Sequence, residues 1–268
     1  MDKNAINLQT VKADPSSFRF IPVEEQTEEL CTEAVKRRPD NLQYVKDQTP
    51  EICMTAVKRD AYTFRYVKEQ TPEICLQAVK QHGYALASVK NQTPEICMAA
   101  VKQAGCALQC VKDQTPEICL AAIQTNPWAF EHVREQTPEI CMAAVKLNGQ
   151  MLDYVKEQTP VICMAAVNHN EFALQYVKEQ TPEICMAAVE YDGTALCYVH
   201  EEIRREHPEI CMAAVMQDGT ALCYVPEEIK REHPEICIAA IEQNPKAEKY
   251  LETDPDLLAD YQYEAMRW

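Results

Sequence analysis

The chain has 268 residues, of which 47% are hydrophobic and 25% charged, a composition that argues against both a disordered and a membrane-spanning protein. With only 5 glycines and three serines, it has almost no material for glycine-rich phosphate loops or serine nucleophile motifs. The excess of 42 acidic over 26 basic residues gives a net charge of -16, which opposes general affinity for nucleic acid or anionic lipid. We therefore predict a protein that is not an enzyme, needs no cofactor and binds neither nucleic acid nor membrane.

The first residues contain no apolar segment behind a basic stretch, so they do not resemble a secretory signal. Fourteen cysteines are about 5% of the chain, below the range of disulfide scaffolds. These features predict an intracellular, cytoplasmic protein whose thiols are reduced.

Ten of the cysteines recur at a fixed step, which marks an internal repeat. Eight of them are 22 residues apart and the last two follow at steps of 26: Cys31, Cys53, Cys75, Cys97, Cys119, Cys141, Cys163, Cys185, Cys211 and Cys237.

Each repeat carries start and stop signals for two short helices. Thr49-Pro50-Glu51 and its equivalents place an N-cap hydroxyl, a proline and an acid at the start of a first helix. Eight residues after the cysteine a Gly such as Gly83, or a Pro, ends that helix. A second apolar segment such as 85–90 then leads to the next cap. We predict a helical hairpin of about two turns plus two turns.

Helices this short cannot persist alone, so the repeats must stack on one another. The predicted fold is all-α: an α-solenoid of about ten helical-hairpin repeats of 22 to 26 residues, with degenerate terminal caps. Its predicted parts are a degenerate N-terminal capping repeat at 1–23, regular 22-residue repeats at 24–200, longer 26-residue repeats at 201–252 and a capping helix at 253–268.

The recurring Pro-Glu-Ile-Cys-Met-Ala-Ala-Val, followed by Asp/Asn-Gly-x-Ala-Leu-x-Tyr-Val, resembles the repeat family catalogued as domain of unknown function 4116. The segment 199–206 is similar to the longer form of that repeat. The resemblance covers roughly residues 24–252. It implies intracellular repeat arrays found in large DNA viruses of protists and in bacteria, without assigned catalytic residues.

The cysteine ladder raises the question of a metal site, because thiolates bind zinc. Equivalent cysteines in neighbouring repeats are too far apart to share one ion, so we interpret them as small buried hydrophobes. One weak candidate cluster remains: Cys106 and Cys110, four residues apart on a predicted second helix, with His132 in the next repeat.

Two positions of the second helix vary in a way that is typical of a binding surface. One position carries large aromatic residues in several repeats, among them Tyr62, Tyr84, Trp128 and Phe172. A second position is tyrosine in most repeats but becomes Ser88, Cys110 and His132 in the middle ones, which suggests a recess there. The alternative is that these side chains only fill gaps between repeats.

Charge separates the two ends of the chain. Residues 1–178 carry 19 basic and 22 acidic groups, whereas residues 179–268 carry 7 and 20. Two ladders of lysines, one at the end of each helix, alternate with acids, which favours dipole compensation and solubility over phosphate binding. The acidic end would attract a basic protein partner.

The function predicted from these features is a non-enzymatic scaffold for protein–protein interaction. An alternative is a structural component of a larger assembly, such as a virion or host-interaction protein, located in a virion or in host cytoplasm. A metal or thiol site at the middle repeats is a remote third reading.

Overall fold

The computed structural model describes residues 3–251, and every regular element in that range is helical. The chain divides into two compact units, an N-terminal unit of residues 1–135 and a C-terminal unit of residues 136–268. The predicted capping helix at 253–268 lies outside the described residues. Between residues 3 and 251, no helix is both long enough and apolar enough to cross a membrane.

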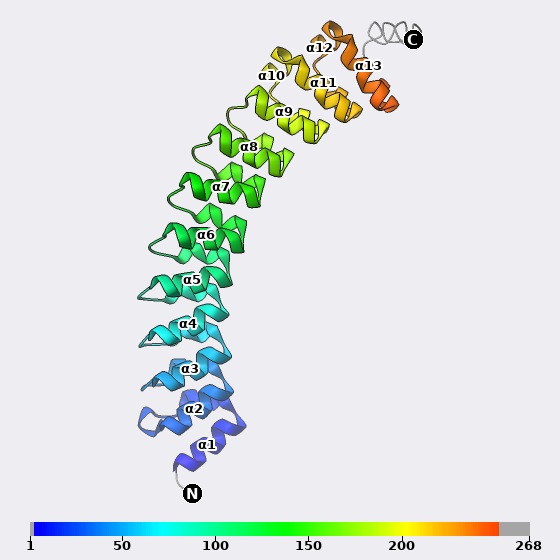
Figure 1. Cartoon of the computed structure of the whole chain (residues 1–268). Helices are drawn as coiled ribbons and strands as arrows, with labels where there is room; N and C mark the ends of the chain where they lie inside the picture. The colour runs from blue at the N-terminus through cyan, green and yellow to red at the C-terminus, as the bar shows by residue number, and fades with distance from the viewer. Residues whose placement is uncertain (1–2, 252–268) are drawn as a thin grey trace. The chain divides into compact units, whose positions relative to one another are not determined.

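The elements alternate between an α-helix and a short 3-10 helix (Figure 1). In the N-terminal unit the α-helices are α1 (Lys3–Ala13), α2 (Glu28–Arg37), α3 (Pro50–Arg59), α4 (Pro72–Gln81), α5 (Pro94–Gln103) and α6 (Pro116–Thr125). Its 3-10 helices are η1 (Pro15–Phe20), η2 (Val23–Glu25), η3 (Pro39–Tyr44), η4 (Ala61–Tyr66), η5 (Gly83–Ser88), η6 (Gly105–Cys110) and η7 (Pro127–His132).

The C-terminal unit continues this alternation, except that two additional short α-helices are inserted. Its α-helices are α7 (Pro138–Leu147), α8 (Pro160–His169), α9 (Pro182–Tyr191), α10 (Glu201–Glu206), α11 (Pro208–Gln217), α12 (Glu227–Glu232) and α13 (Pro234–Gln243). Its 3-10 helices are η8 (Gly149–Tyr154), η9 (Glu171–Tyr176), η10 (Gly193–Tyr198), η11 (Gly219–Tyr224) and η12 (Pro245–Tyr250).

The α-helices start where the Thr-Pro-Glu signal predicts. In α3 the Thr49 hydroxyl accepts the backbone N–H of Ile52 at 3.3 Å, and Pro50 occupies the first helical position, where no N–H is needed. The same cap recurs in each 22-residue repeat from α2 to α9. The sequence signal therefore fixes the helix start.

The second helix of each hairpin is a six-residue 3-10 helix, and the first has ten residues, which is longer than the predicted two turns. The 3-10 helix lies between two extended residues, such as Asp60 at φ -151° and Val67 at φ -70°, ψ 118°. The Asp60 carboxylate caps the N–H of Tyr62. Six residues bounded in this way suit the tighter 3-10 form, which occurs in short pieces.

Within each unit, α-helices contact the next α-helix and 3-10 helices contact the next 3-10 helix (Figure 1). The first helix turns its Ile, Cys, Ala and Val into the core: in α3, Ile52, Cys53, Ala56 and Val57 are all buried. Each unit is thus a stack of α/3-10 repeats that share a continuous core, and the predicted α-solenoid fold is confirmed.

The glycines serve close packing rather than a left-handed helix end. No glycine between residues 3 and 251 has positive φ. A Cβ at Gly83 would lie 2.6 Å from the carbonyl oxygen of Ala100 in the next repeat. The Gly83 N–H donates to Oε1 of Gln103, which also comes from the next repeat. Where proline takes the glycine position, as at Pro127, there is no N–H to satisfy.

A glutamine before each Thr-Pro pair clamps neighbouring repeats together. Gln158 donates from Nε2 to the carbonyl oxygens of Leu152 and Tyr176, at 3.1 and 2.8 Å, and accepts the backbone N–H of Lys178 at 3.0 Å. Equivalent pairs of contacts to the following repeat are made by Gln26, Gln48, Gln70, Gln92, Gln114, Gln136 and Gln180. We call these residues the glutamine clamps.

The two longer repeats replace the clamp by an inserted helix. Lys230 on α12 is buried, and its ammonium donates to the Tyr250 carbonyl at 3.3 Å and to Glu227 at 2.8 Å. On α10, Arg204 donates to the Tyr224 carbonyl in the same way. A cation on the extra turn therefore reaches the carbonyl that a glutamine reaches in the short repeats.

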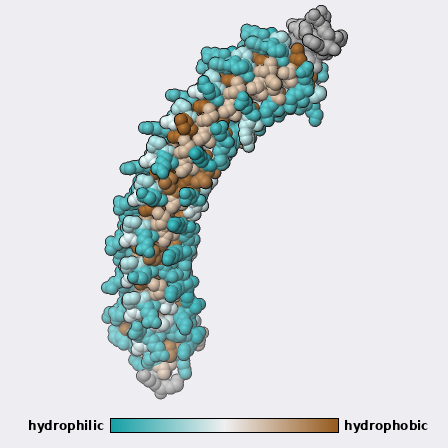
Figure 2. Space-filling model, in the orientation of Figure 1, coloured by the Kyte–Doolittle hydropathy of each residue, from teal (hydrophilic) through white to brown (hydrophobic). Residues whose placement is uncertain are grey.

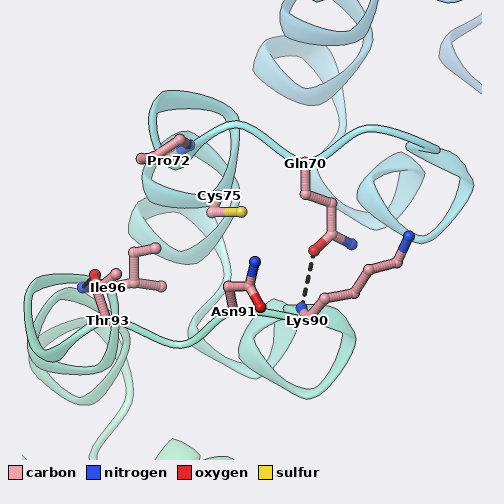
Figure 3. Close-up of a pocket in the computed structure, with 7 residues that line it drawn as sticks. All are labelled: Gln70, Pro72, Cys75, Lys90, Asn91, Thr93 and Ile96. Carbon is pink, nitrogen blue, oxygen red and sulfur yellow. Dashed lines mark hydrogen bonds between the residues drawn. The ribbon is translucent and has the colours of Figure 1, made fainter.

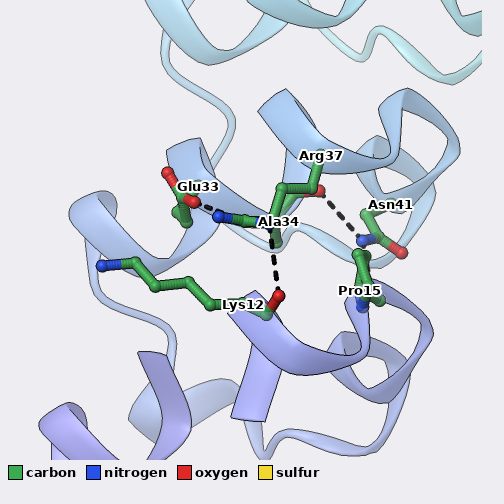
Figure 4. A network of polar contacts seen from close by, with 6 residues as sticks. All are labelled: Lys12, Pro15, Glu33, Ala34, Arg37 and Asn41. Carbon is green, nitrogen blue, oxygen red and sulfur yellow. Dashed lines mark hydrogen bonds and ion pairs between the residues drawn. The ribbon is translucent and has the colours of Figure 1, made fainter. Parts of the chain in front are cut away.

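The first α-helix and 3-10 helix, α1 and η1, repeat the pattern in degenerate form and pack on α2 and η3. A polar network closes this seam (Figure 4): Arg37 donates to the Lys12 carbonyl, and buried Asn41 donates to the carbonyls of Pro15 and Ala34. The amide of Asn41 thus links η3 to η1 and to α2 through two backbone carbonyls.

Candidate functional site

Three exposed aromatic side chains follow the 3-10 helices of the N-terminal unit, and we call them the aromatic strip. Tyr62 on η4, Tyr84 on η5 and Trp128 on η7 are 61%, 39% and 45% exposed. Each is the second residue of its 3-10 helix, and η4 to η7 contact one another in order. The fold thus brings these three predicted residues onto one row of neighbouring elements.

Three rings at one end of the strip pack against one another in tilted pairs. The His82 ring lies between two tyrosines, with centroids 4.7 Å from Tyr62 and 5.7 Å from Tyr84. The backbone beneath is fixed, because side chains at the N-caps accept the N–H groups of Tyr62 and Trp128. His82 was not among the predicted site residues, although its position directly before the Gly of the repeat places it beside the variable aromatics.

Cys106 occupies the equivalent position on η6, between Tyr84 and Trp128 in repeat order. Its sulfur accepts a hydrogen bond from Asn126 at 3.3 Å and is half-buried. The strip is therefore interrupted by a smaller side chain at the third repeat of the row.

Phe172, the fourth aromatic residue predicted at this position, lies in the C-terminal unit. It is the second residue of η9, is 40% exposed, and packs edge-on to Tyr198 with centroids 5.9 Å apart. Its local environment resembles that of the strip residues.

Ser88, Cys110 and His132 end the 3-10 helices η5, η6 and η7, and Ser88 is exposed while the other two are half-buried. Their backbone carbonyls accept the amides of the glutamine clamps at 2.8, 2.9 and 3.0 Å. Because the clamp uses only the backbone at this position, the side chain is free to vary. This gives a packing reason for the variation that the sequence analysis interpreted as a recess.

Two recesses lie elsewhere, between the loops of consecutive repeats. One, of about 220 Å³, lies in the N-terminal unit, and an equivalent of about 250 Å³ lies in the C-terminal unit. In Figure 3 the first recess has Cys75 on one side and Lys90 and Asn91 on the other. Burial raises the pKa of Cys75, so its thiol stays protonated and is a poor nucleophile.

The predicted ligand cluster of Cys106, Cys110 and His132 is not formed. A 3-10 helix has three residues per turn, so residues four apart point in different directions, whereas an α-helix would align them. Throughout residues 3–251, no three His, Cys, Asp or Glu side chains are grouped closely enough to hold a metal ion.

The cysteine ladder is buried, as predicted. All ten repeat cysteines have low exposure, and burial raises the pKa of Cys31, Cys211 and Cys237 to about 11 and that of Cys185 to about 12. The four other cysteines lie on 3-10 helices; Cys223 is exposed, and Cys106, Cys110 and Cys197 are half-buried.

The lysines of the second ladder donate hydrogen bonds to backbone carbonyls of the preceding repeat. The ammonium of Lys68 donates to the carbonyls of Val45 and Lys46, and Lys90 donates to Lys68 one repeat further on. Lys112 and Lys178 make the same contact. These cations are therefore engaged by the chain itself, which agrees with a structural rather than a phosphate-binding role.

The family model described as Domain of unknown function (DUF4116) matches the chain seven times, at residues 27–71, 49–92, 93–137, 115–158, 162–204, 181–230 and 207–257. Each match spans about two of the repeats seen in the structure. Neither the curated proteins nor the solved structures gave a match.

Proposed function

Because the chain belongs to the DUF4116 family, whose description names no activity, we propose a function from the surface alone: a non-enzymatic scaffold that binds a protein partner through the aromatic strip. The observation that carries the proposal is the row of exposed rings Tyr62, Tyr84 and Trp128 on η4, η5 and η7, three members of one series of contacting 3-10 helices.

Aromatic side chains of this kind are favoured at the centres of protein interfaces. Tyr and Trp combine a large apolar area with a polar group, and they dominate the binding energy of many interfaces. In the strip, the adjoining rings of Tyr62, His82 and Tyr84 give a continuous surface that a partner can cover. Trp128 gives a further anchor two repeats along the row.

The scaffold beneath the strip supports binding because it is already ordered. The glutamine clamps and the buried Ile, Cys, Ala and Val of each repeat fix one 3-10 helix against the next. A partner therefore does not have to order the chain on binding, and this lowers the free-energy cost of association.

The experiment is a quantitative capture of partners by the tagged full chain from the lysate of its source cell, followed by binding measurements with the recovered protein. We expect one protein at near-equal molar amount. Trp128→Ala should weaken its binding at least tenfold, and Tyr62→Ala with Tyr84→Ala should do the same.

The matched control is Phe20→Ala, which removes a ring that is 74% exposed on η1, outside the strip. It should leave the affinity unchanged. If all variants bind the partner as the original chain does, the strip is not the interface. Recovery of a whole particle instead of a single protein would favour the alternative of a structural component.

A further inference from the structure

The C-terminal unit carries a second apolar surface on its α-helices. Met and Ala follow the repeat cysteine at the two outward positions of α7, α8, α9 and α11, with Ile and Ala on α13, and all ten side chains are half-buried. Figure 2 shows this as a pale to brown stripe over these helices, with hydrophilic surface on both sides. We call it the Met-Ala face. Its Met and Ile residues are Met142, Met164, Met186, Met212 and Ile238.

Large apolar side chains extend the face beyond the stripe. Val161 on α8, Tyr191 on α9 and Met216 on α11 are 69%, 66% and 66% exposed, and Leu147 ends α7 at 44%. The α-helices of the N-terminal unit have large apolar side chains of comparable exposure only on α1, at Ile6. The helices α3 to α6 also carry a half-buried Met or Leu after the repeat cysteine, but α2 to α6 lack the exposed apolar side chains that extend the face in the C-terminal unit.

The helices that form the face carry almost only negative charges themselves. The five helices α7, α8, α9, α11 and α13 contain six glutamates and one lysine, Lys146. The five helices α2 to α6 contain seven glutamates and six lysines or arginines, so their charges nearly cancel. The glutamates around the Met-Ala face are Glu139, Glu183, Glu190, Glu209, Glu235 and Glu242.

We propose that the Met-Ala face binds a basic amphipathic helix of a partner protein. The basic charge follows from complementarity with the glutamates at both ends of the helices. Methionine side chains are flexible and polarisable and adapt to apolar helices of different shape.

The partner must be helical because the face offers no backbone groups to pair with. The N–H and C=O groups along an α-helix are bonded within the helix, and Met, Ala and Ile have no strong hydrogen-bonding groups. An extended peptide on this face would bury unpaired backbone groups, whereas a helix brings its own bonds.

The spacing of the repeats fits such a partner. Neighbouring helices pack about 8–10 Å apart, and a helix rises about 10 Å in seven residues. A helix lying across α7 to α13 would therefore meet a new repeat about every seven residues. One apolar anchor per heptad, flanked by lysines, is the expected pattern.

The test uses the full chain and a labelled synthetic helix of about 25 residues, with leucines on one face and lysines beside them, measured by fluorescence anisotropy. We expect binding that weakens as salt rises, and at least tenfold weaker binding of a peptide with glutamates in place of the lysines. The triple variant Val161→Ser, Tyr191→Ser and Met216→Ser should also bind at least tenfold more weakly.

The matched control is Phe20→Ser, an exposed ring in the N-terminal unit. Equal affinity for the basic and acidic peptides, or an unchanged affinity of the triple variant, would overturn the proposal. The proposal would also be overturned if the chain forms a dimer that the triple variant disrupts and the control does not, because the face would then bind a second copy. This inference extends the proposed scaffold function, but the peptide assay does not depend on the aromatic strip, so the two proposals can fail separately.

Discussion

At each glutamine clamp, a single side chain makes several hydrogen bonds that link two repeats. The amide of Gln158 donates to two carbonyls, and its oxygen accepts the N–H of Lys178 and, at 3.7 Å, the thiol of Cys163. A carboxylate could not donate, and an aliphatic side chain could do neither. The amide therefore serves both the donor and the acceptor side of the seam.

Gln158→Ala should lower the free energy of unfolding by about 1–3 kcal/mol, because the Tyr176 carbonyl and the Lys178 N–H of the next repeat lose the amide that links them to the preceding repeat. Urea unfolding followed by circular dichroism measures the change. The control Gln175→Ala removes an exposed amide that bonds only the Phe172 carbonyl of its own helix, and it should change stability by less than about 0.5 kcal/mol. Equal effects of the two substitutions would contradict a special role for the clamp.

The buried thiols make stability depend on alkaline pH. Burial raises the pKa of Cys185 to about 12 in the folded chain, from an ordinary value of 9.0. Below pH 9 both states hold the proton, so the full stability is present. Above pH 9 the unfolded thiol ionises while the folded one does not, and this ionisation lowers the free energy of the unfolded state.

Stability should therefore fall as pH rises from about 9 towards 12. Urea unfolding midpoints across this range, under reducing conditions, give the slope. Tyrosines and lysines titrate in the same range, so the slope of Cys185→Ala is the necessary comparison. We expect a shallower decline for that variant; an identical slope would mean that Cys185 does not contribute.

At the scale of the element, the sequence predicts the α-helices well, and it predicts the 3-10 helices that pair with them less well. Thr49-Pro50-Glu51 encodes a local cap, and the cap is the same in every context. The choice of 3-10 over α for residues 61–66 depends on where the chain must turn to meet the next repeat, which is a tertiary constraint. The weak candidate metal cluster of Cys106, Cys110 and His132 rested on α-helical spacing, and the 3-10 helix does not bring these side chains together.

The aromatic strip was predictable, because its residues stand out from a regular repeat. The glutamine clamps were not recognised, although Gln-Thr-Pro recurs as regularly as the cysteine. A polar residue that recurs in every repeat can either face solvent or form a hydrogen bond between repeats, and only the three-dimensional structure distinguishes the two. The Met and Ala of the Met-Ala face recur visibly in the sequence, but only the structure shows that they form one surface across neighbouring helices (Figure 2).

The inserted helix α12 shows how one element can replace a clamp. The Lys230 side chain is 4% exposed and bonds both Glu227 and the Tyr250 carbonyl. Lys230→Met keeps the apolar stem but removes the donor, and it should lower the free energy of unfolding by about 1–3 kcal/mol. Chemical denaturation measures this loss.

Lys246→Met on η12 is the control, because this exposed lysine keeps its backbone contact to Asn244 when the ammonium is lost. Its effect should stay below about 0.5 kcal/mol. If Lys230→Met leaves the free energy of unfolding unchanged, the packing of Ile229 and not the charge of Lys230 holds α12 in place.

For the whole molecule, stability is a sum over neighbouring repeats, because the elements of each unit contact the repeats directly before and after them. A local defect should therefore weaken its own seam and spread little. Gly83→Ala is a suitable defect. Since no glycine of residues 3–251 has positive φ, chain entropy alone would make the change favourable by about 0.4–1 kcal/mol.

The contact that the new side chain makes, and not chain entropy, decides whether Gly83→Ala stabilises or destabilises the fold. The new Cβ would lie 2.6 Å from the Ala100 oxygen, and such overpacking costs about 1–3 kcal/mol. Hydrogen exchange measured by mass spectrometry should show faster exchange in η5 and α5, with a decline over the next repeats of the N-terminal unit. Uniformly faster exchange throughout that unit would mean that its repeats unfold as a single cooperative block rather than as coupled neighbours.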